Sequence, residues 1–404
     1  MNIFVINSGS SSIKYQLIKM PEAEIACSGI VERIGLENAV ITHKTFPAGE
    51  ERITKLMPEM PDHAEGLAQV ALLLTDASIG VIKDPAEIEV VGHRVVHGGE
   101  SFAETTVITR EVKAEIKKLF PLAPLHNPSN YLGIDVAEKI FSAAIQVAVF
   151  DTAFHQSIPE KAFRFAVPAS FYYDHGIRVY GFHGTSHKFV SEQAIAYLGK
   201  QDTKIITIHL GNGCSMTAVK NGRSIDTSMG MGPMNGLIMG TRAGDIDQSM
   251  IFHLVNQLGY EIEQVHAILN KKSGMLGLTG FSDMRDIRAE MDKGDGAAKL
   301  AYDMYAYRIR KYLGAYTAAM NGLDAIVFTG GVGENDVLMR YMCANGLEYL
   351  GINLDREKNE AKQSVLREIN TSASRVKILV IPTNEEQEIA SQCVKLLTSQ
   401  AIER

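Results

Sequence analysis

Tryptophan is absent from this sequence, and cysteine occurs only four times in 404 residues. The missing tryptophan excludes no class of protein. The cysteines are Cys27, Cys214, Cys343 and Cys393, and because no two of them form a CxxC pair, a zinc ribbon and a thioredoxin-type redox motif are excluded. A disulfide framework is not expected in a long chain with so few cysteines. We therefore expect a soluble protein of a reducing compartment, the cytoplasm.

Long hydrophobic runs and an excess of positive charge are also missing. No apolar run approaches the roughly 18 residues that span a bilayer, and the N-terminus has neither a basic region nor a cleavage-like site, so no membrane is expected as a partner. Lys and Arg number 40 against 47 Asp and Glu, so general binding to nucleic acid is not expected. Hydrophobic residues make up 46 % of the sequence, which excludes a disordered chain. The length suggests roughly two or three domains.

Glycines gather at the ends of short apolar runs, and these runs alternate with amphipathic helical stretches along the chain. This alternation predicts an α/β protein. Residues 3–17 form an apolar run, a Gly/Ser turn and a second apolar run, which predicts a β-hairpin. Residues 205–219 repeat the same pattern, so we expect a duplicated domain core.

Two later apolar runs also end in turns. The run 325–328 leads through a glycine turn in 329–335 into a helix, and the run 376–381 leads into a helix that Thr383 or Asn384 can cap. Glycine turns at strand ends let backbone N–H groups approach a phosphate. A P-loop and a GxGxxG motif are absent, so we expect a nucleotide at the hairpin turns, in a cleft between two related domains.

Histidines beside glycine suggest a metal site, but their spacing disfavours one. His93 and His97, like His183 and His187, are four residues apart, and this spacing chelates a metal only on a helix. The first pair lies in a Val-rich segment that predicts a strand, and a helix N-cap expected within 185–186 leaves His183 outside the helix. An HExxH motif is absent as well. A zinc hydrolase is therefore a minor alternative.

Charged residues stand at the ends of apolar strands and in glycine-framed loops. Asp151 follows the apolar run 146–150, Arg94 lies within a predicted strand, and Arg242 lies in a glycine-bracketed loop. Ligand sites of open α/β sheets form at the carboxyl ends of strands. We therefore expect these groups to handle an anion.

Phosphoryl transfer has the matching demand, because negative charge spreads over the oxygens of the moving group and must be neutralised. Arg94 and Arg242 are cations with several donors, and His183 can donate a hydrogen bond to the same oxygens. Asn7 and Glu385 offer oxygen ligands that suit Mg²⁺. The residues alone predict a two-lobed phosphotransferase that depends on a magnesium nucleotide.

Many of these strings resemble the acetate kinase family, and the match runs in order along essentially the whole chain. The matching strings are residues 7–14, 92–99, 123–128, 150–155, 181–187, 209–213, 227–230, 328–335 and 381–386. The resemblance implies two duplicated actin-like (ribonuclease H-like) α/β domains with a nucleotide cleft between them. The first domain would comprise residues 1–152 and 386–404. The second, 153–385, would bind nucleotide and form a homodimer.

The resemblance also implies a reaction and its residues. ATP and acetate would exchange reversibly with ADP and acetyl phosphate by direct in-line transfer, with Mg²⁺, for which Mn²⁺ can substitute. The implied catalytic residues are Arg94 for the carboxylate, Asp151 for orientation, His183 for the transition state and Arg242 for the phosphoryl oxygens. The implied metal ligands are Asn7 and Glu385. The implied pocket for the methyl group consists of Val96, Leu125, Phe182 and Pro233. The implied nucleotide-binding residues are Lys14, His209, Leu210, Gly211, Asn212, Gly213, Asp283, Met284, Arg285, Gly331, Val332, Gly333, Glu334 and Asn335.

The sequence departs from the family's pattern at 232–236, which is Gly-Pro-Met-Asn-Gly where the family commonly has Thr-Pro-Leu-Glu-Gly. One methylene in an apolar pocket is worth only about 1–3 kcal/mol, so a propionate or other short-chain carboxylate kinase is the alternative within this fold. Val96 favours acetate, because it is bulkier than the alanine of propionate-preferring relatives. An actin-like ATPase without a carboxylate substrate is the alternative from another class.

Overall fold

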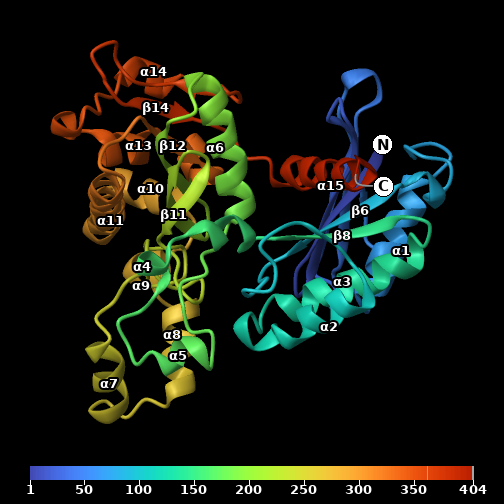
Figure 1. The fold of residues 1–404 in the computed structure, drawn as a ribbon, viewed down its shortest axis with the longest axis horizontal. Coiled ribbons are helices and arrows are strands. Elements are labelled where there is room, and N and C mark those ends of the chain that lie inside the picture. Colours follow the sequence, from blue (N-terminus) through green and yellow to red (C-terminus); the bar gives the residue numbers. More distant parts are fainter. Residues whose placement is uncertain (362, 403–404) are drawn as a thin grey trace. The chain divides into compact units, whose positions relative to one another are not determined.

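The computed structural model describes residues 1–361 and 363–402, which form two compact units. Unit 1 comprises Met1–Phe154 and the chain from Asn384 onward, and unit 2 comprises His155–Thr383 (Figure 1). The boundaries expected from the sequence, after residues 152 and 385, each lie two residues from these. The nucleotide-binding and dimerisation roles expected of the second domain stay predictions. None of the helices in the described residues is both long and apolar enough to cross a membrane.

Unit 1 is built on one mixed sheet. Its strands are β1 (Asn2–Ser8), β2 (Ser12–Lys19), β3 (Glu24–Glu32), β4 (Val40–Thr45), β5 (Arg52–Leu56), β6 (Val90–Val95), β7 (Thr106–Val107) and β8 (Ile145–Phe150). Their order in the sheet is β5-β4-β3-β2-β1-β6-β8-β7. Strands β1 to β5 are antiparallel neighbours, whereas β6 is parallel to both β1 and β8.

Helices cover both faces of this sheet. They are α1 (His63–Leu74), α2 (Arg110–Lys118), α3 (Asn127–Ile140) and α15 (Glu385–Ile402). The side chain of Asn384 accepts a hydrogen bond from the backbone N–H of Gln387 at 3.0 Å, which confirms Asn384 as the cap of α15. The first turn of α15 carries three glutamates, and such charges are favourable at a helix N-terminus.

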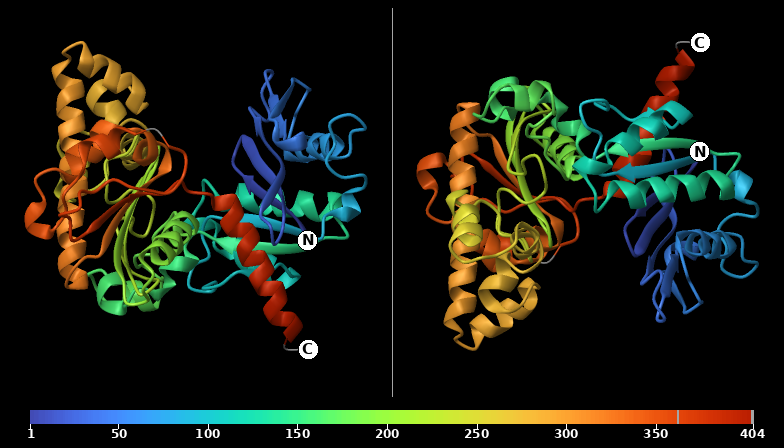
Figure 2. Two further views of the ribbon diagram at one scale, coloured as in Figure 1. Left: turned by 90° about the horizontal axis from the view of Figure 1, so that it is seen from above. Right: turned by 90° about the horizontal axis from the view of Figure 1, so that it is seen from below.

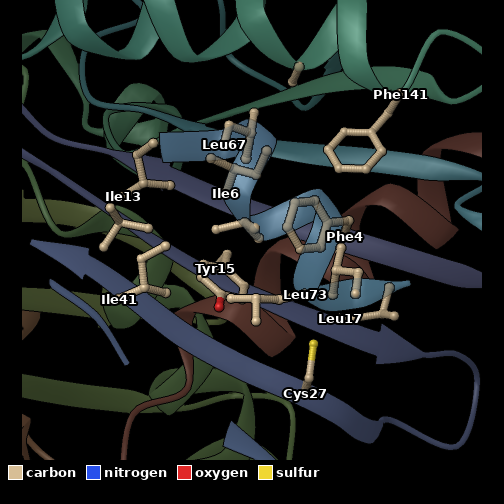
Figure 3. Packing of buried hydrophobic residues seen from close by; sticks show 14 of the residues in the cluster. Phe4, Ile6, Ile13, Tyr15, Leu17, Cys27, Ile41, Leu67, Leu73 and Phe141 are labelled. Carbon is tan, nitrogen blue, oxygen red and sulfur yellow. The ribbon is translucent and has the colours of Figure 1, made fainter. Parts of the chain in front are cut away.

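The side chains of β1 alternate between two cores. Ile3 and Val5 pack against α15, whereas Phe4 and Ile6 pack against α1 and α3 on the other face. Figure 3 shows Phe4 and Ile6 in this second cluster, close to Phe141. Each of these four β1 residues is at most 1 % exposed. Strand β1 is therefore buried on both faces, and this packing fixes the position of its carboxyl end.

Unit 2 contains a second mixed sheet. Its strands are β9 (Lys204–Leu210), β10 (Cys214–Lys220), β11 (Arg223–Thr227), β12 (Ala325–Thr329), β13 (Arg367–Glu368) and β14 (Lys377–Val380), in the order β11-β10-β9-β12-β14-β13. Its helices are α4 (Glu160–Phe163), α5 (Ser170–Tyr173), α6 (Gly184–Leu198), α7 (Ser249–Asn256), α8 (Ile262–Lys271), α9 (Gly274–Thr279), α10 (Met284–Asp292), α11 (Gly296–Met320), α12 (Gly330–Asn335), α13 (Val337–Ala344) and α14 (Arg356–Glu360). Figure 2 shows α6 and α11 on opposite sides of this sheet.

The two sheets share one topology. In each, a hairpin-linked antiparallel run (β3-β2-β1 or β11-β10-β9) is followed by two strands parallel to its first strand (β6 and β8, or β12 and β14). Both predicted hairpins and the predicted turn from strand to helix after β12 are present. The α/β fold class and the duplicated core expected from the sequence are therefore confirmed.

Helix α15 packs tightly against the sheet of unit 1 at Gly92. A Cβ atom at this position would lie 2.8 Å from Ile389 Cγ2 and 3.1 Å from Cys393 Sγ. We expect Gly92→Ala to lower the free energy of unfolding by about 1–3 kcal/mol, because the helix must shift to admit the methyl group. Urea denaturation of the purified variant measures this change.

Gly314 provides the control, because a Cβ atom there, on helix α11, meets no neighbour within 4 Å. Gly314→Ala should raise stability by roughly 0.5–1 kcal/mol through helix propensity. Equal effects of the two substitutions would contradict the packing described for α15.

Candidate active site

In unit 1, polar side chains gather at the carboxyl ends of the parallel strands β1, β6 and β8. Asn7 lies near the end of β1, Arg94 near the end of β6, and Asp151 directly follows β8. Arg94 Nη1 donates to Asn7 Oδ1 at 3.3 Å, and Arg94 Nη2 forms an ion pair with Asp151. The side chains of Asp151 and Arg94 are 1 % and 20 % exposed, so the pair is largely shielded from water.

The first turn of α15 adds two carboxylates to this group. Glu385 Oε2 lies 4.0 Å from Arg94 Nε, and Glu386 forms an ion pair with Lys14 of β2. Burial raises the pKa of Glu385, Arg94 acts against this, and the carboxylate of Asp151 raises it further. Burial by itself would lower the pKa of Arg94, but Asp151 and Glu385 together raise it above its ordinary value. Because one guanidinium serves two carboxylates, the surplus negative charge suits a divalent cation.

Two asparagines that the sequence analysis did not single out fix the chain beyond Arg94. Asn130 Oδ1 accepts a hydrogen bond from the backbone N–H of Val96 at 3.0 Å, and Asn130 Nδ2 donates to the carbonyl of Ser8 at 2.7 Å. Asn127 Oδ1 accepts from the backbone N–H of His97 at 3.0 Å. Their spacing of one helical turn at the start of α3 was the available signal. The expected methyl pocket is represented here by Val96, which is buried, and by Leu125, which is 58 % exposed.

In unit 2, His183 occupies a strained position at the start of α6. Its φ is +57°, a left-handed conformation that costs a non-glycine residue about 1–3 kcal/mol and is enriched at active sites. The predicted N-cap at Thr185 or Ser186 was wrong, because the helix begins at Gly184 and His183 is the N-cap. Ser186 Oγ instead lies 2.8 Å from His209 Nδ1, so its hydroxyl serves a tertiary contact rather than the helix end.

Gly213 brings the predicted groups of unit 2 together. A Cβ atom at Gly213 would lie 2.6 Å from Arg242 Nη2 and 3.4 Å from His183 Nε2, so both side chains close on the same glycine. The ring of His209 stacks on that of His183 with centroids 4.5 Å apart. Asn212, next in the turn, accepts a backbone hydrogen bond from Gly240 at 3.0 Å, which ties the turn to the loop of Arg242. Only glycine fits at position 213 without displacing a catalytic candidate.

Arg242 carries a positive charge that no neighbouring acid balances. Its Nη1 donates to the carbonyl oxygen of Pro233 at 2.6 Å. Within residues 1–361 and 363–402, no carboxylate forms an ion pair with this guanidinium, and burial lowers its pKa despite an opposing effect of Cys214. A partly buried cation without a counter-ion is less favourable than one that binds an anion. Arg242 is therefore a candidate anion site whose charge, unlike that of Arg94, no carboxylate of the described residues neutralises.

The predicted nucleotide residues Leu210 and Gly211 and residues 331–335 lie at the carboxyl ends of β9 and β12. Leu210 ends β9, and Gly330 opens α12 directly after β12 with a φ of +76°. A Cβ atom at Gly330 would lie 2.8 Å from the carbonyl oxygen of Leu210, so the two glycine turns touch. Glu334 Oε1 accepts backbone hydrogen bonds from Gly330 at 3.0 Å and Thr383 at 3.1 Å. Glu334 thus closes the turn that holds Gly331, Val332 and Gly333.

A cavity of about 570 Å³ opens beside α12, and Glu334, Asn335 and Arg340 are among its lining residues. Asn335 Nδ2 donates to the carbonyl of Gly331 at 2.9 Å. Arg340 donates to the carbonyls of Gly333 and Glu334 at 3.0 and 2.8 Å, so it holds the end of the same turn. The volume falls within the range of pockets for nucleotide-sized ligands.

The predicted residues at the start of α10 reach α12 only indirectly. Asp283 caps α10 and forms an ion pair with Arg285 at 2.6 Å, and hydrogen bonds from Arg285 lower the pKa of Asp283 to about 2. The Tyr302 hydroxyl lies 3.0 Å from the carbonyl of Met284 and 2.9 Å from Asp336 Oδ2, just after α12. No hydrogen bond or ion pair in the described part of the chain joins Asp283 or Arg285 to α12.

The described residues do not support the zinc alternative. Within them, no group of three or more His, Cys, Asp and Glu side chains is placed to hold a metal ion. His93 lies in β6, as predicted, and its Nε2 is 2.7 Å from Gln146 Oε1. A magnesium site needs fewer protein ligands, because this ion keeps most of its water.

The match to a family model extends over nearly the whole chain, residues 2–391, and the model describes the acetokinase family. This chain belongs to the acetokinase family. The chain is 60 % identical over 397 residues to an acetate kinase from Flavobacterium johnsoniae, covering 98 % of this chain and 100 % of that protein. A crystal structure of Porphyromonas gingivalis acetate kinase, 44 % identical, matches with a TM-score of 0.93 over 98 % of this chain and 99 % of that one. A propionate kinase from Francisella tularensis, 40 % identical, matches with a TM-score of 0.89 over 97 % of this chain and 98 % of that one.

The acetokinase resemblance stated from the motifs is therefore confirmed, and with it the α/β fold class. The roles of single residues stay predictions. They divide into one group around Arg94 in unit 1 and one around Arg242 in unit 2.

The unbalanced charge of Arg242 predicts a stability change. Arg242→Met removes the partly buried cation and puts an unbranched apolar side chain in its place. The thermal midpoint of the ligand-free variant should therefore lie above that of the wild type. Arg94→Met is the matched comparison and should lower the midpoint, because it leaves Asp151 and Glu385 without their counter-ion. Differential scanning fluorimetry in phosphate-free buffer measures both. A lower midpoint for Arg242→Met would contradict the electrostatic description of this site.

Proposed function

We propose that this protein transfers the γ-phosphoryl group of ATP reversibly to acetate, giving acetyl phosphate and ADP. Membership of the acetokinase family and the high identity to an acetate kinase support the reaction. The observation that carries the site is the unbalanced positive charge of Arg242 beside His183 and Gly213. The enzyme is thus a phosphotransferase with a carboxyl group as acceptor.

The transfer needs no proton removal, since acetate is already a carboxylate at neutral pH. One carboxylate oxygen attacks the γ-phosphorus, the bond from phosphorus to the β–γ bridging oxygen breaks, and its electron pair leaves with ADP. The protein must therefore position the reactants and stabilise charge on the equatorial oxygens. We assign this task to Arg242, whose planar guanidinium offers several donors, and to His183 through Nε2.

We assign Arg94 to the acetate carboxylate and Asp151 to the orientation of Arg94. Two facts support this assignment. Asp151 forms an ion pair with Arg94 Nη2, and Asn7 accepts from Nη1, so the guanidinium is held in one orientation. The backbone of Val96 is fixed by Asn130, which places an apolar side chain two residues beyond Arg94.

From the family resemblance we also assign Leu125, Phe182 and Pro233 to the methyl group of acetate. The carbonyl of Pro233 holds Arg242 at 2.6 Å, which links the unusual 232–236 segment to the phosphoryl site. We propose acetate as the preferred acid and propionate as a slower substrate, because a methylene changes binding by only about 1–3 kcal/mol. The similarity to a propionate kinase keeps that activity as the second candidate.

We propose Asn7 Oδ1 and Glu385 Oε2 as ligands of Mg²⁺, because both are oxygen atoms and both lie in the group where two carboxylates share the guanidinium of Arg94, at 3.3 and 4.0 Å from it. Magnesium typically binds one or two such groups and keeps its waters. When bound with ATP, it supplies positive charge to the phosphate oxygens.

We assign the nucleotide to the two glycine turns of unit 2, the residues at the start of α10 and Lys14. The turns support this, since their backbones touch at Gly330 and Leu210, and Glu334 and Asn335, which follow the second turn, line the cavity beside α12. We further propose a homodimer and a cytoplasmic location. All four cysteines are free and buried, as expected for a reducing compartment.

Trapping of acyl phosphate as a hydroxamate, with ATP, Mg²⁺ and acids of two to four carbons, tests the proposal. Acetate should give the highest kcat/KM. Arg242→Ala should lower kcat by roughly a hundredfold or more, as expected for the loss of a donor to transition-state charge. Arg94→Ala should raise the KM for acetate as well as lower turnover.

Lys299→Ala is the control, since Lys299 forms an exposed ion pair with Asp303 on α11 at 2.6 Å and lines neither the cavity beside α12 nor the glycine turns. It should retain wild-type activity. ATP hydrolysis that is independent of any acid would favour the actin-like ATPase. Near-normal acetyl phosphate formation by folded Arg242→Ala and Arg94→Ala would refute the site.

A further inference from the structure

A buried chain of hydrogen bonds runs behind His183. His183 Nδ1 lies 2.9 Å from Ser215 Oγ, and Ser215 Oγ lies 2.7 Å from His187 Nε2. His187 Nδ1 lies 2.7 Å from Thr207 Oγ1, and this hydroxyl lies 3.4 Å from the carbonyl oxygen of Thr217. The chain thus links α6 to the neighbouring strands β9 and β10.

The residues behind His183 in this hydrogen-bond chain are fully buried. Ser215, His187 and Thr207 are each 0 % exposed. Because buried polar groups need partners inside the protein, each hydrogen atom in the chain has a defined acceptor. Burial lowers the pKa of His187 well below its ordinary value, and His155 and His209 lower it further, so His187 is neutral with one N–H.

The position of Arg242 determines which nitrogen of His183 must carry its proton. A Cβ atom on Gly213 would lie 2.6 Å from Arg242 Nη2 and 3.4 Å from His183 Nε2, and a neighbouring guanidinium disfavours a second cation. A neutral His183 can donate to a phosphoryl oxygen only when its proton is on Nε2. Its Nδ1 must then accept a hydrogen bond, and Ser215 is the donor in reach.

The rest of the chain follows from donor counting. A serine hydroxyl has one hydrogen, so Ser215 that donates to His183 must accept from His187 Nε2–H. His187 Nδ1 then accepts, and its donor is Thr207 Oγ1–H at 2.7 Å. Thr207 is available for this, because its other acceptor, the carbonyl of Thr217, is at 3.4 Å, the distance of a weak hydrogen bond.

We propose that Ser215, His187 and Thr207 are positioning residues that hold the proton of His183 on Nε2, where it can donate to the transferred phosphoryl group. The inference deepens the proposed function and rests on it for the role of His183. The same chain fixes the plane of the ring, which keeps a residue with a left-handed backbone in one rotamer.

Nuclear magnetic resonance of the ligand-free protein labelled with ¹⁵N-histidine tests the inference without any assay of activity. Long-range ¹H–¹⁵N couplings identify the protonated nitrogen of each ring, and His183→Gln assigns the signals of His183. The wild type should show His183 protonated on Nε2. Ser215→Ala and Thr207→Val should convert this signal to a mixture of tautomers or to the Nδ1–H form. A wild-type ring protonated on Nδ1 would overturn the inference.

Kinetics with conservative variants supply the second readout. Ser215→Ala and Thr207→Val should lower kcat roughly tenfold or more, with KM values for ATP and acetate changed less than about threefold. Ser215→Thr and Thr207→Ser keep the hydroxyl and should restore most of kcat. Circular dichroism and thermal midpoints confirm that each variant is folded.

Thr217→Val is the matched control, because Thr217 is also 0 % exposed and lies on β10, but its hydroxyl pairs with Thr227 at 3.2 Å, outside the chain. It should leave kcat and the His183 tautomer unchanged. Equal losses in Thr217→Val and Thr207→Val would reduce the chain to a packing role and overturn the inference. A wild type that forms no acyl phosphate would refute the proposed function instead, and the tautomer measurement would still decide the inference.

Discussion

The uncompensated positive charge of Arg242 is the constraint on which the site in unit 2 depends. Its guanidinium is partly withdrawn from water, and in the described residues its partner is the carbonyl of Pro233 rather than a carboxylate. The charge is held beside His183, a histidine with a left-handed backbone, and Gly213 leaves room for both. Such an arrangement lowers the stability of the ligand-free protein. The same positive charge interacts favourably with an anion whose negative charge grows during the reaction.

The two units share one topology but surround their arginines with different charges. In both sheets the parallel strands deliver side chains and glycine turns at their carboxyl ends. Unit 1 places Asp151 and Glu385 around Arg94, so the cation there is shared, and the metal ion that we propose would supply the further positive charge that acetate needs. Unit 2 places no acid against Arg242 among the described residues, so its strand ends favour phosphate. Duplication supplied the scaffold, and the residues at the strand ends supplied the chemistry.

Features that depend on neighbours in sequence could be predicted from the sequence. Both hairpins and the Asn384 cap of α15 follow from local turn and cap chemistry, and the structure has them. The N-cap at Thr185 or Ser186 was wrong, because the Ser186 hydroxyl is engaged by His209 from another element. The hydrogen-bond chain through Ser215 and Thr207 could not be predicted, because it depends on the register of β9 with β10 and on how α6 packs against them. Serine and threonine in such runs usually indicate only an ordinary buried strand. Residue roles came from family motifs, whereas the contrast between Arg94 and Arg242 required three-dimensional partners.

Chemical rescue of Arg242→Ala by free guanidinium tests most directly whether the charge at this position serves the moving phosphoryl group. Acetyl phosphate formation by the variant is measured with increasing guanidinium chloride, with sodium chloride at equal ionic strength as the reference. The account predicts that kcat rises in a saturable manner while the KM values for ATP and acetate stay nearly constant. A folded variant that binds both substrates and gains no activity from guanidinium would contradict it.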